Sequence, residues 1–100
     1  MMVEFSIVPV SDSRHLSEPI ARALKIVHTS GVEYRLTPMG TLLRGEWDEV
    51  MAVIKQCHET LRQDFDRVIT NIKIDDVLEQ PAFDDKIDSV EQKSGLKLNK

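Results

Sequence analysis

Polar side chains at positions expected to lie in β-strands are the residues of this chain best suited to bind a ligand. They are Ser6, Thr41, Arg44, Glu46 and Asn71. Inside a mostly apolar sheet covered by a partner, such groups need hydrogen-bond partners, because burying an unpaired polar group costs free energy. A bound polar heterocycle would supply those partners, and ion pairs between subunits would do so equally well. The sequence alone is compatible with both ligand binding and ion pairs between subunits.

Catalytic and metal-binding patterns are missing from the sequence. Cys57 and His58 are adjacent, but neighbouring residues on a helix point about 100° apart, so they cannot pair as thiolate and base. Cys57 is therefore expected to be a core residue. His15, His28 and His58 fall at no metal-ligand spacing, and a single cysteine permits neither a CxxC pair nor an internal disulfide. We expect no metal site, no cofactor and no enzymatic activity.

Composition narrows the possible partners. The net charge is -4, and the 13 basic residues are interspersed with 17 acids, which disfavours a nucleic-acid partner. Hydrophobic residues make up 41% of the chain, which is sufficient for a folded domain. No apolar run approaches the ~20 residues that span a bilayer. With one cysteine and no secretion signal, the chain is expected to be soluble and cytoplasmic.

The spacing of apolar residues predicts the elements that position these side chains. A first strand covers residues 3–10 and ends at Ser11-Asp12-Ser13, and a helix follows as far as Ser30-Gly31. Strands are predicted over residues 32–37, 41–46 and 67–75, with a second helix from Trp47 through Leu61. The chain reads as one domain, 1–100, with its core in residues 3–76 and a C-terminal extension, 77–100. A short helix is predicted in this extension.

The stretch from Tyr34 to Met51 organises the middle of the chain. Pro38, Met39 and Gly40 form a short connection, so the strands on either side of it are expected to pair antiparallel. Gly40 and Gly45 bracket the third strand, where an unusual φ would explain glycine. Tyr34 and Trp47 could stack on a flat ligand, although apolar faces favour a place in the core.

The predicted fold class is α+β. The order strand, helix, strand, strand, helix, strand is that of ferredoxin-like βαββαβ domains, with helices covering one face of a four-stranded antiparallel sheet. The other face would then expose Val8, Leu42 and Ile69, an apolar patch that a monomer seldom leaves in water. We expect self-association through this face.

Two segments resemble the thiamine-binding protein family. They are TPMGTLLRGEWDEVMAVIKQCHETL, from Thr37 to Leu61, and DRVITNIKID, from Asp66 to Asp75. The MGT turn, the glycine-acid step into the helix, the HE pair late in that helix and the RV…KID strand carry the resemblance. It implies the ferredoxin-like fold, a homotetramer built as a dimer of dimers, and binding of thiamine or its hydroxymethylpyrimidine part at subunit contacts.

On this resemblance the site takes the following form. Thr41, Ser6 and Asn71 hydrogen-bond the aminopyrimidine, and Glu46 accepts from its amino group or faces the cationic ring. Met39 supplies apolar contact, together with Tyr34 or Trp47. Arg44 is included because it stands where family members carry an acid. A cation there disfavours the positive thiazolium if its side chain lines the site.

Two alternatives remain at this stage. One is an oligomeric assembly or regulatory module without a ligand, which Arg44 favours. The other is a small cofactor-free enzyme, which is an analogy at the level of the fold only.

Overall fold

One of the two inner strands of the sheet is β1 (Met2–Pro9), whose side chains alternate between a buried and a more exposed face. Val3, Phe5, Ile7 and Pro9 are buried. Strand alternation therefore holds along the whole strand, as the sequence predicted.

The computed structural model describes residues 1–11 and 16–100. Asp12 and Ser13, where a turn was predicted, and His15 lie outside the described residues. No helix in the described ranges combines the length and apolar character needed to cross a membrane.

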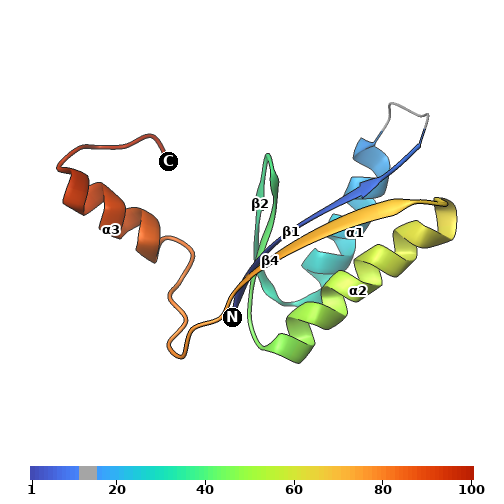
Figure 1. Cartoon of the computed structure of the whole chain (residues 1–100), viewed down its shortest axis with the longest axis horizontal. Helices are drawn as coiled ribbons and strands as arrows, with labels where there is room; N and C mark the ends of the chain where they lie inside the picture. The colour runs from blue at the N-terminus through green and yellow to red at the C-terminus, as the bar shows by residue number, and fades with distance from the viewer. Residues whose placement is uncertain (12–15) are drawn as a thin grey trace.

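Helices α1 (Ser17–Ser30) and α2 (Trp47–Asp64) lie on the buried face of the sheet (Figure 1). The core consists of inward residues of both helices and of the strands: Val3, Phe5, Ile7, Ala23, Val27, Leu43, Val50, Val53, Ile54, Cys57 and Leu61. Gly31 ends α1 with φ of 79°, the left-handed conformation that glycine adopts readily. Trp47 is 52% exposed, so its expected place in the core is wrong. It is the first residue of α2, one turn before Val50, where the helix first reaches the core.

Strands β2 (Glu33–Thr37) and β3 (Gly40–Arg44) form an antiparallel hairpin. The Thr37 hydroxyl organises its turn, because it accepts the N–H of Gly40 at 3.1 Å and donates to the Gly40 carbonyl at 2.8 Å. β3 ends two residues earlier than predicted. Gly45 instead donates its N–H to the Met1 carbonyl at 3.1 Å, which leads the chain into α2.

Gly40 has a role that differs from the predicted one. Within the described residues only Gly31 and Gly95 have positive φ, so neither Gly40 nor Gly45 is needed for an unusual φ. A Cβ atom at Gly40 would lie 2.9 Å from the Phe5 carbonyl oxygen. Glycine is therefore required because the hairpin approaches the backbone of β1 closely.

The last strand, β4 (Val68–Asp75), pairs antiparallel with β1 along its full length. The sheet order is β2-β3-β1-β4, and every neighbouring pair is antiparallel. The ferredoxin-like fold class is thus confirmed. Because α1 and α2 cover one face, the opposite face, which we call the open face, carries no helix of the sheet-forming core (Figure 1).

Residues 76–100, the C-terminal arm, contain α3 (Asp85–Ser94), which ends at Gly95 with φ of 69°. The short helix predicted in this extension is confirmed. Two arginines of the hairpin hold the base of the arm. Arg44 donates to the carbonyls of Gln80 and Pro81, both at 2.9 Å, and Arg35 binds both carboxylate oxygens of Asp84 at 2.6 and 3.0 Å.

Candidate ligand-binding site on the open sheet face

Strand register decides which side chains the open face presents. β1 contributes Met2, Glu4, Ser6 and Val8, and β4 contributes Ile69, Asn71, Lys73 and Asp75. β3 adds Leu42 and Arg44, and β2 adds Glu33, Arg35 and Thr37. The face therefore combines apolar, acidic, basic and amide groups. The predicted apolar patch is present, since Val8 is 42% and Ile69 41% exposed.

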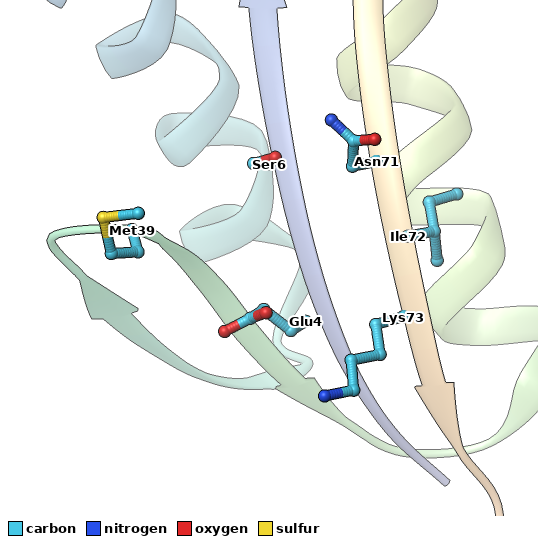
Figure 2. Close-up of a pocket in the computed structure, with 6 residues that line it drawn as sticks. All are labelled: Glu4, Ser6, Met39, Asn71, Ile72 and Lys73. Atoms are coloured by element: carbon cyan, nitrogen blue, oxygen red, sulfur yellow. The ribbon is translucent and has the colours of Figure 1, made fainter.

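A hollow of about 140 Å³ lies on this face, and we call it the Ser6–Asn71 hollow. Its lining consists of Glu4, Ser6, Met39, Asn71, Ile72 and Lys73 (Figure 2). Ser6 lies directly opposite Asn71 and Glu4 opposite Lys73 in the β1–β4 register. Directly opposed residues on one face hold their Cβ atoms about 4.5–5.5 Å apart, so these side chains border a common space. Met39 enters from the hairpin turn, as Figure 2 shows.

The polar side chains of this hollow have no bonding partners in the described part of the chain. Within residues 1–11 and 16–100, the side chains of Glu4, Ser6, Asn71 and Lys73 form no hydrogen bond and no ion pair. Glu4 and Lys73 stay apart even though they face each other across the two strands. A carboxylate, a hydroxyl, a carboxamide and an ammonium group are therefore available to a ligand.

A second hollow of about 420 Å³ adjoins the first and shares Glu4 and Lys73 with it. Its lining is completed by Met2, Leu42, Ile74, Asp75 and Lys86. Asp75 and Lys86 form an ion pair at 2.6 Å, and this hydrogen bond holds the pKa of the Asp75 carboxyl below its usual range. The ion pair ties the first turn of α3 to the end of β4.

The Ser6–Asn71 hollow is small for a complete vitamin-sized ligand. Sites that bury most of such a ligand usually enclose about 300–1,000 Å³. A hollow of about 140 Å³ has room for a single ring, and the remainder of a larger molecule would extend toward the second hollow or against another chain.

Three of the predicted site residues, Ser6, Met39 and Asn71, line the Ser6–Asn71 hollow, and four do not. Thr41, 3% exposed, faces the helices and lines a neighbouring hollow of about 230 Å³, which it shares with Ser6 and Met39 as well as Ile20 and Leu24. Strand alternation is the reason, because Thr41 points the same way as the buried Leu43.

The other three predicted residues, Tyr34, Arg44 and Glu46, also lie outside the hollow. Tyr34 faces the helices, where its hydroxyl is 2.7 Å from Nδ1 of His28. Arg44 is on the open face but holds the base of the C-terminal arm. Glu46 precedes the first turn of α2, beyond the end of β3.

Sequence reasoning missed Glu4 and Lys73. Both are charged residues in strands, and such residues normally indicate a solvated face, so nothing in their type suggested a site. The available signal was position. Glu4 shares its face with Ser6, and Lys73 shares its face with Asn71, so the register between the first and last strands would have placed all four together.

The thiol and the described histidines lie elsewhere. Cys57 is fully buried, and desolvation raises the pKa of its thiol to about 11. Nδ1 of His58 lies 2.6 Å from the Thr70 hydroxyl, on the helix-covered side. The described part of the chain contains no group of three or more His, Cys, Asp or Glu side chains placed to hold a metal ion.

Known proteins are similar to this chain in fold and in sequence. Residues 3–91 match the family model described as Thiamine-binding protein. A UPF0045 protein of Methanothermobacter thermautotrophicus is 37% identical over 94 residues, covering 90% of this chain and 95% of that protein. The crystal structure of hypothetical protein MJ1052 from Methanocaldococcus jannaschii has a TM-score of 0.82 at 26% identity, covering 91% and 95% of the two chains. That of a Thermotoga maritima "putative thiamine biosynthesis/salvage protein" has a TM-score of 0.78 at 26% identity, covering 89% and 96%. The chain belongs to the thiamine-binding protein family.

Proposed function

We propose that this protein binds thiamine, or a related molecule containing a pyrimidine ring, without transforming it. The observation that carries the proposal is the Ser6–Asn71 hollow, where an unpaired carboxylate lies beside a hydroxyl and a carboxamide. The family to which the chain belongs, and the printed description of its Thermotoga maritima relative, support the choice of ligand.

The chemistry of the lining fits an aminopyrimidine. The Asn71 carboxamide offers both a donor and an acceptor, and the Ser6 hydroxyl can serve as either, so together they can pair with ring nitrogens and an exocyclic amino group. The Glu4 carboxylate accepts from that amino group or balances a cationic ring. Met39, 84% exposed at the hairpin turn, can fold over the ring as a flexible apolar cover.

A second chain completes the site in this proposal. The hollow is shallow and lies on a face whose apolar residues, Val8, Leu42 and Ile69, call for a cover. Packing of the open faces of two copies would bury the ligand and the patch together. A homotetramer made from two such dimers is the proposed assembly, with a cytoplasmic location.

The proposal is a binding function rather than catalysis. Among the residues that the structure describes, the cysteine and the histidines lie in the core or on the helix-covered side: Cys57 is buried, and His28 and His58 contact hydroxyls of Tyr34 and Thr70. Thiamine recovered from the complex should therefore be chemically unchanged by mass spectrometry.

Calorimetric titration with thiamine tests the site. Glu4→Gln keeps the size of the side chain but removes its charge, and Asn71→Ala removes the carboxamide. Glu4→Gln should weaken binding at least about tenfold, because hydrogen bonds that involve a charged group contribute about 1.5–3 kcal/mol, and Asn71→Ala should weaken it about two- to tenfold, because a neutral hydrogen bond contributes about 0.5–1.5 kcal/mol. Glu59→Gln is the matched control, because Glu59 lies on α2, 62% exposed and paired with Lys55.

Unchanged affinity in both Glu4→Gln and Asn71→Ala would contradict the proposed site. Absence of binding by the wild-type protein would contradict the proposal that thiamine is the ligand. Titration with hydroxymethylpyrimidine alone then separates recognition of the pyrimidine from recognition of the thiazolium.

A ligand-free assembly module is the second candidate, and the exposed Val8 and Ile69 favour it. The two candidates differ in thermal unfolding. A carrier is stabilised by excess thiamine, because a ligand that binds only the folded state raises the unfolding temperature. An assembly module without a ligand keeps the same unfolding temperature.

A further inference from the structure

The C-terminal arm places a helix where it has nothing to pack against within its own chain. None of the residues of α3 is buried, and Ile87 and Val90 are 40% and 60% exposed. These two residues are three apart, so they form one apolar strip on the helix. Figure 1 shows α3 apart from α1 and α2, beyond the end of the sheet where β1 begins and β4 ends.

A helix of this length is not expected to be stable alone. α3 has 10 residues, whereas isolated helices shorter than about 12–15 residues are marginal in water. Most helical stability in proteins comes from burying one face, and the described part of this chain provides no cover for the Ile87–Val90 strip. Something outside the chain must cover it.

The base of the arm is fixed rather than loose. Arg44 binds the carbonyls of Gln80 and Pro81, and Arg35 binds Asp84 through two hydrogen bonds while lying 5.4 Å from the centroid of the Phe83 ring. The hydrogen bonds from Arg35 hold the pKa of the Asp84 carboxyl below its usual range. These contacts anchor the arm at the end of its own sheet and direct α3 away from it.

The same chain carries the complementary surface. The open face exposes Val8 and Ile69 at the end of the sheet opposite to the arm, and α1 and α2 leave this face uncovered. A two-fold axis between two open faces, perpendicular to the strands, brings the arm end of one sheet over the Val8–Ile69 end of the other. Such a contact is reciprocal, since each copy gives an arm and receives one.

Charges on the two surfaces also match. Arg67, which directly precedes β4 at the Val8–Ile69 end of the sheet, takes part in no ion pair of the described chain. In the first turn of α3, Asp85 likewise has no ion-pair partner in the described chain, whereas Asp88 pairs with Lys100 at 3.5 Å. Opposite charges beside an apolar contact fix the register of an interface.

We propose that α3 of one copy packs its Ile87–Val90 strip on the open sheet face of a second copy, so that the arms are exchanged within a dimer. The exchanged arm covers the Val8–Ile69 end of the partner's open face, and the remainder of the two open faces packs together. Each arm is thereby held at its base by the hairpin arginines of its own chain and at α3 by the partner.

A photo-cross-linking experiment tests the exchange on the full chain. p-Benzoylphenylalanine replaces Val90 in one sample and, as the matched control on the opposite side of α3, the exposed Gln92 in another. Irradiation of the Val90 sample should give a cross-linked species with twice the mass of the chain, mapped by mass spectrometry to β1, β3 or β4. The Gln92 sample should give at least fivefold less of it.

Cross-links from position 90 that stay within one chain, that map to α1 or α2, or that do not form would each overturn the proposal. Light scattering gives an independent measure. Val90→Lys should lower the molar mass of the assembly, whereas Leu78→Lys, at a fully exposed position in the arm, should not change it. Both experiments are done without thiamine, so their outcome is independent of the proposed ligand.

Discussion

At the scale of single residues, the adjacent Cys57 and His58 show how a helix separates neighbours. The Cys57 thiol points into the core, where it donates a weak hydrogen bond to the Ala23 carbonyl at 3.4 Å. His58 points toward Thr70 on β4. The two side chains never meet, which confirms the sequence prediction that Cys57 is a core residue.

The buried thiol predicts a pH dependence of stability. Burial raises the pKa of Cys57 from an ordinary value of 9.0 to about 11, so the folded state retains a proton that the unfolded state loses. Stability from this group is complete below pH 9 and declines as the pH rises toward 11. Between pH 8 and pH 10.5 the wild type should lose about 2 kcal/mol more than Cys57→Ala.

Urea unfolding of both proteins at the two pH values measures this difference. Lysine and tyrosine ionisation is common to both proteins and cancels in the comparison. Equal losses in the two proteins would show that the thiol titrates normally.

Part of the candidate site could be predicted from residue type, and part could not. Ser6, Met39 and Asn71 were predicted as site residues, and the structure brings them together. Thr41 was grouped with them because it is polar, although alternation from Leu43 turns it toward the helices. Glu4 was not predicted, because an acidic residue in a strand usually faces solvent. Only the strand register places it opposite Lys73.

At the scale of elements, the contact between the hairpin and β1 depends on one missing methyl group. A Cβ atom on Gly40 would lie 2.9 Å from the Phe5 carbonyl oxygen, and backbone cannot move aside as a flexible side chain can. This gives a physical reason for the glycine in the MGT turn. The turn sets the distance between β3 and β1, and with it the position of Met39.

Gly40→Ala should therefore destabilise the protein by about 1–3 kcal/mol, the usual cost of overpacking. Gly45→Ala is the comparison, because the nearest atom to its Cβ would be a Val50 methyl at 3.3 Å, which can shift. Urea unfolding of both variants gives the difference. A Gly40→Ala variant as stable as Gly45→Ala would show that β1 and the hairpin can separate without cost.

Elements were predicted well where apolar residues recur regularly. The alternation in β1 and β4 gave their boundaries to within one residue, and the helical strip of α2 gave its start and an end three residues short of Asp64, because burial imposes those periods directly. Trp47 was wrongly placed in the core, because the spacing of apolar residues in α2 does not indicate where this helix extends past the end of the sheet. The placing of α3 could not be predicted, since it depends on arginines from two other strands.

At the scale of the whole molecule, Arg44 connects the hairpin to the C-terminal arm. Its guanidinium donates to two backbone carbonyls of the arm and lies 3.2 Å from the Glu33 carboxylate. Arg44, which the sequence suggested as a ligand-binding residue, therefore has a structural role in holding the arm against the hairpin.

Loss of this contact should free the arm. Arg44→Ala removes two charge-assisted hydrogen bonds, each contributing about 1.5–3 kcal/mol, so amide hydrogen exchange over residues 80–94 should accelerate at least about tenfold. Arg62→Ala serves as the control, because Arg62 donates to the Phe65 carbonyl at the end of its own helix. Unchanged exchange over residues 80–94 in Arg44→Ala would show that the arm is held by other contacts.

β4 lies at the outer edge of the sheet order, so one side of its backbone has no neighbouring strand within the described chain. Ile69, Ile72 and Ile74 along it are each about 40% exposed, and such an edge is a template for sheet-by-sheet aggregation. Lys73 is the cation among these isoleucines, and charges of this kind protect edges. The ammonium group that borders the Ser6–Asn71 hollow therefore also protects solubility, so a variant chosen to alter ligand selectivity at this position could instead precipitate.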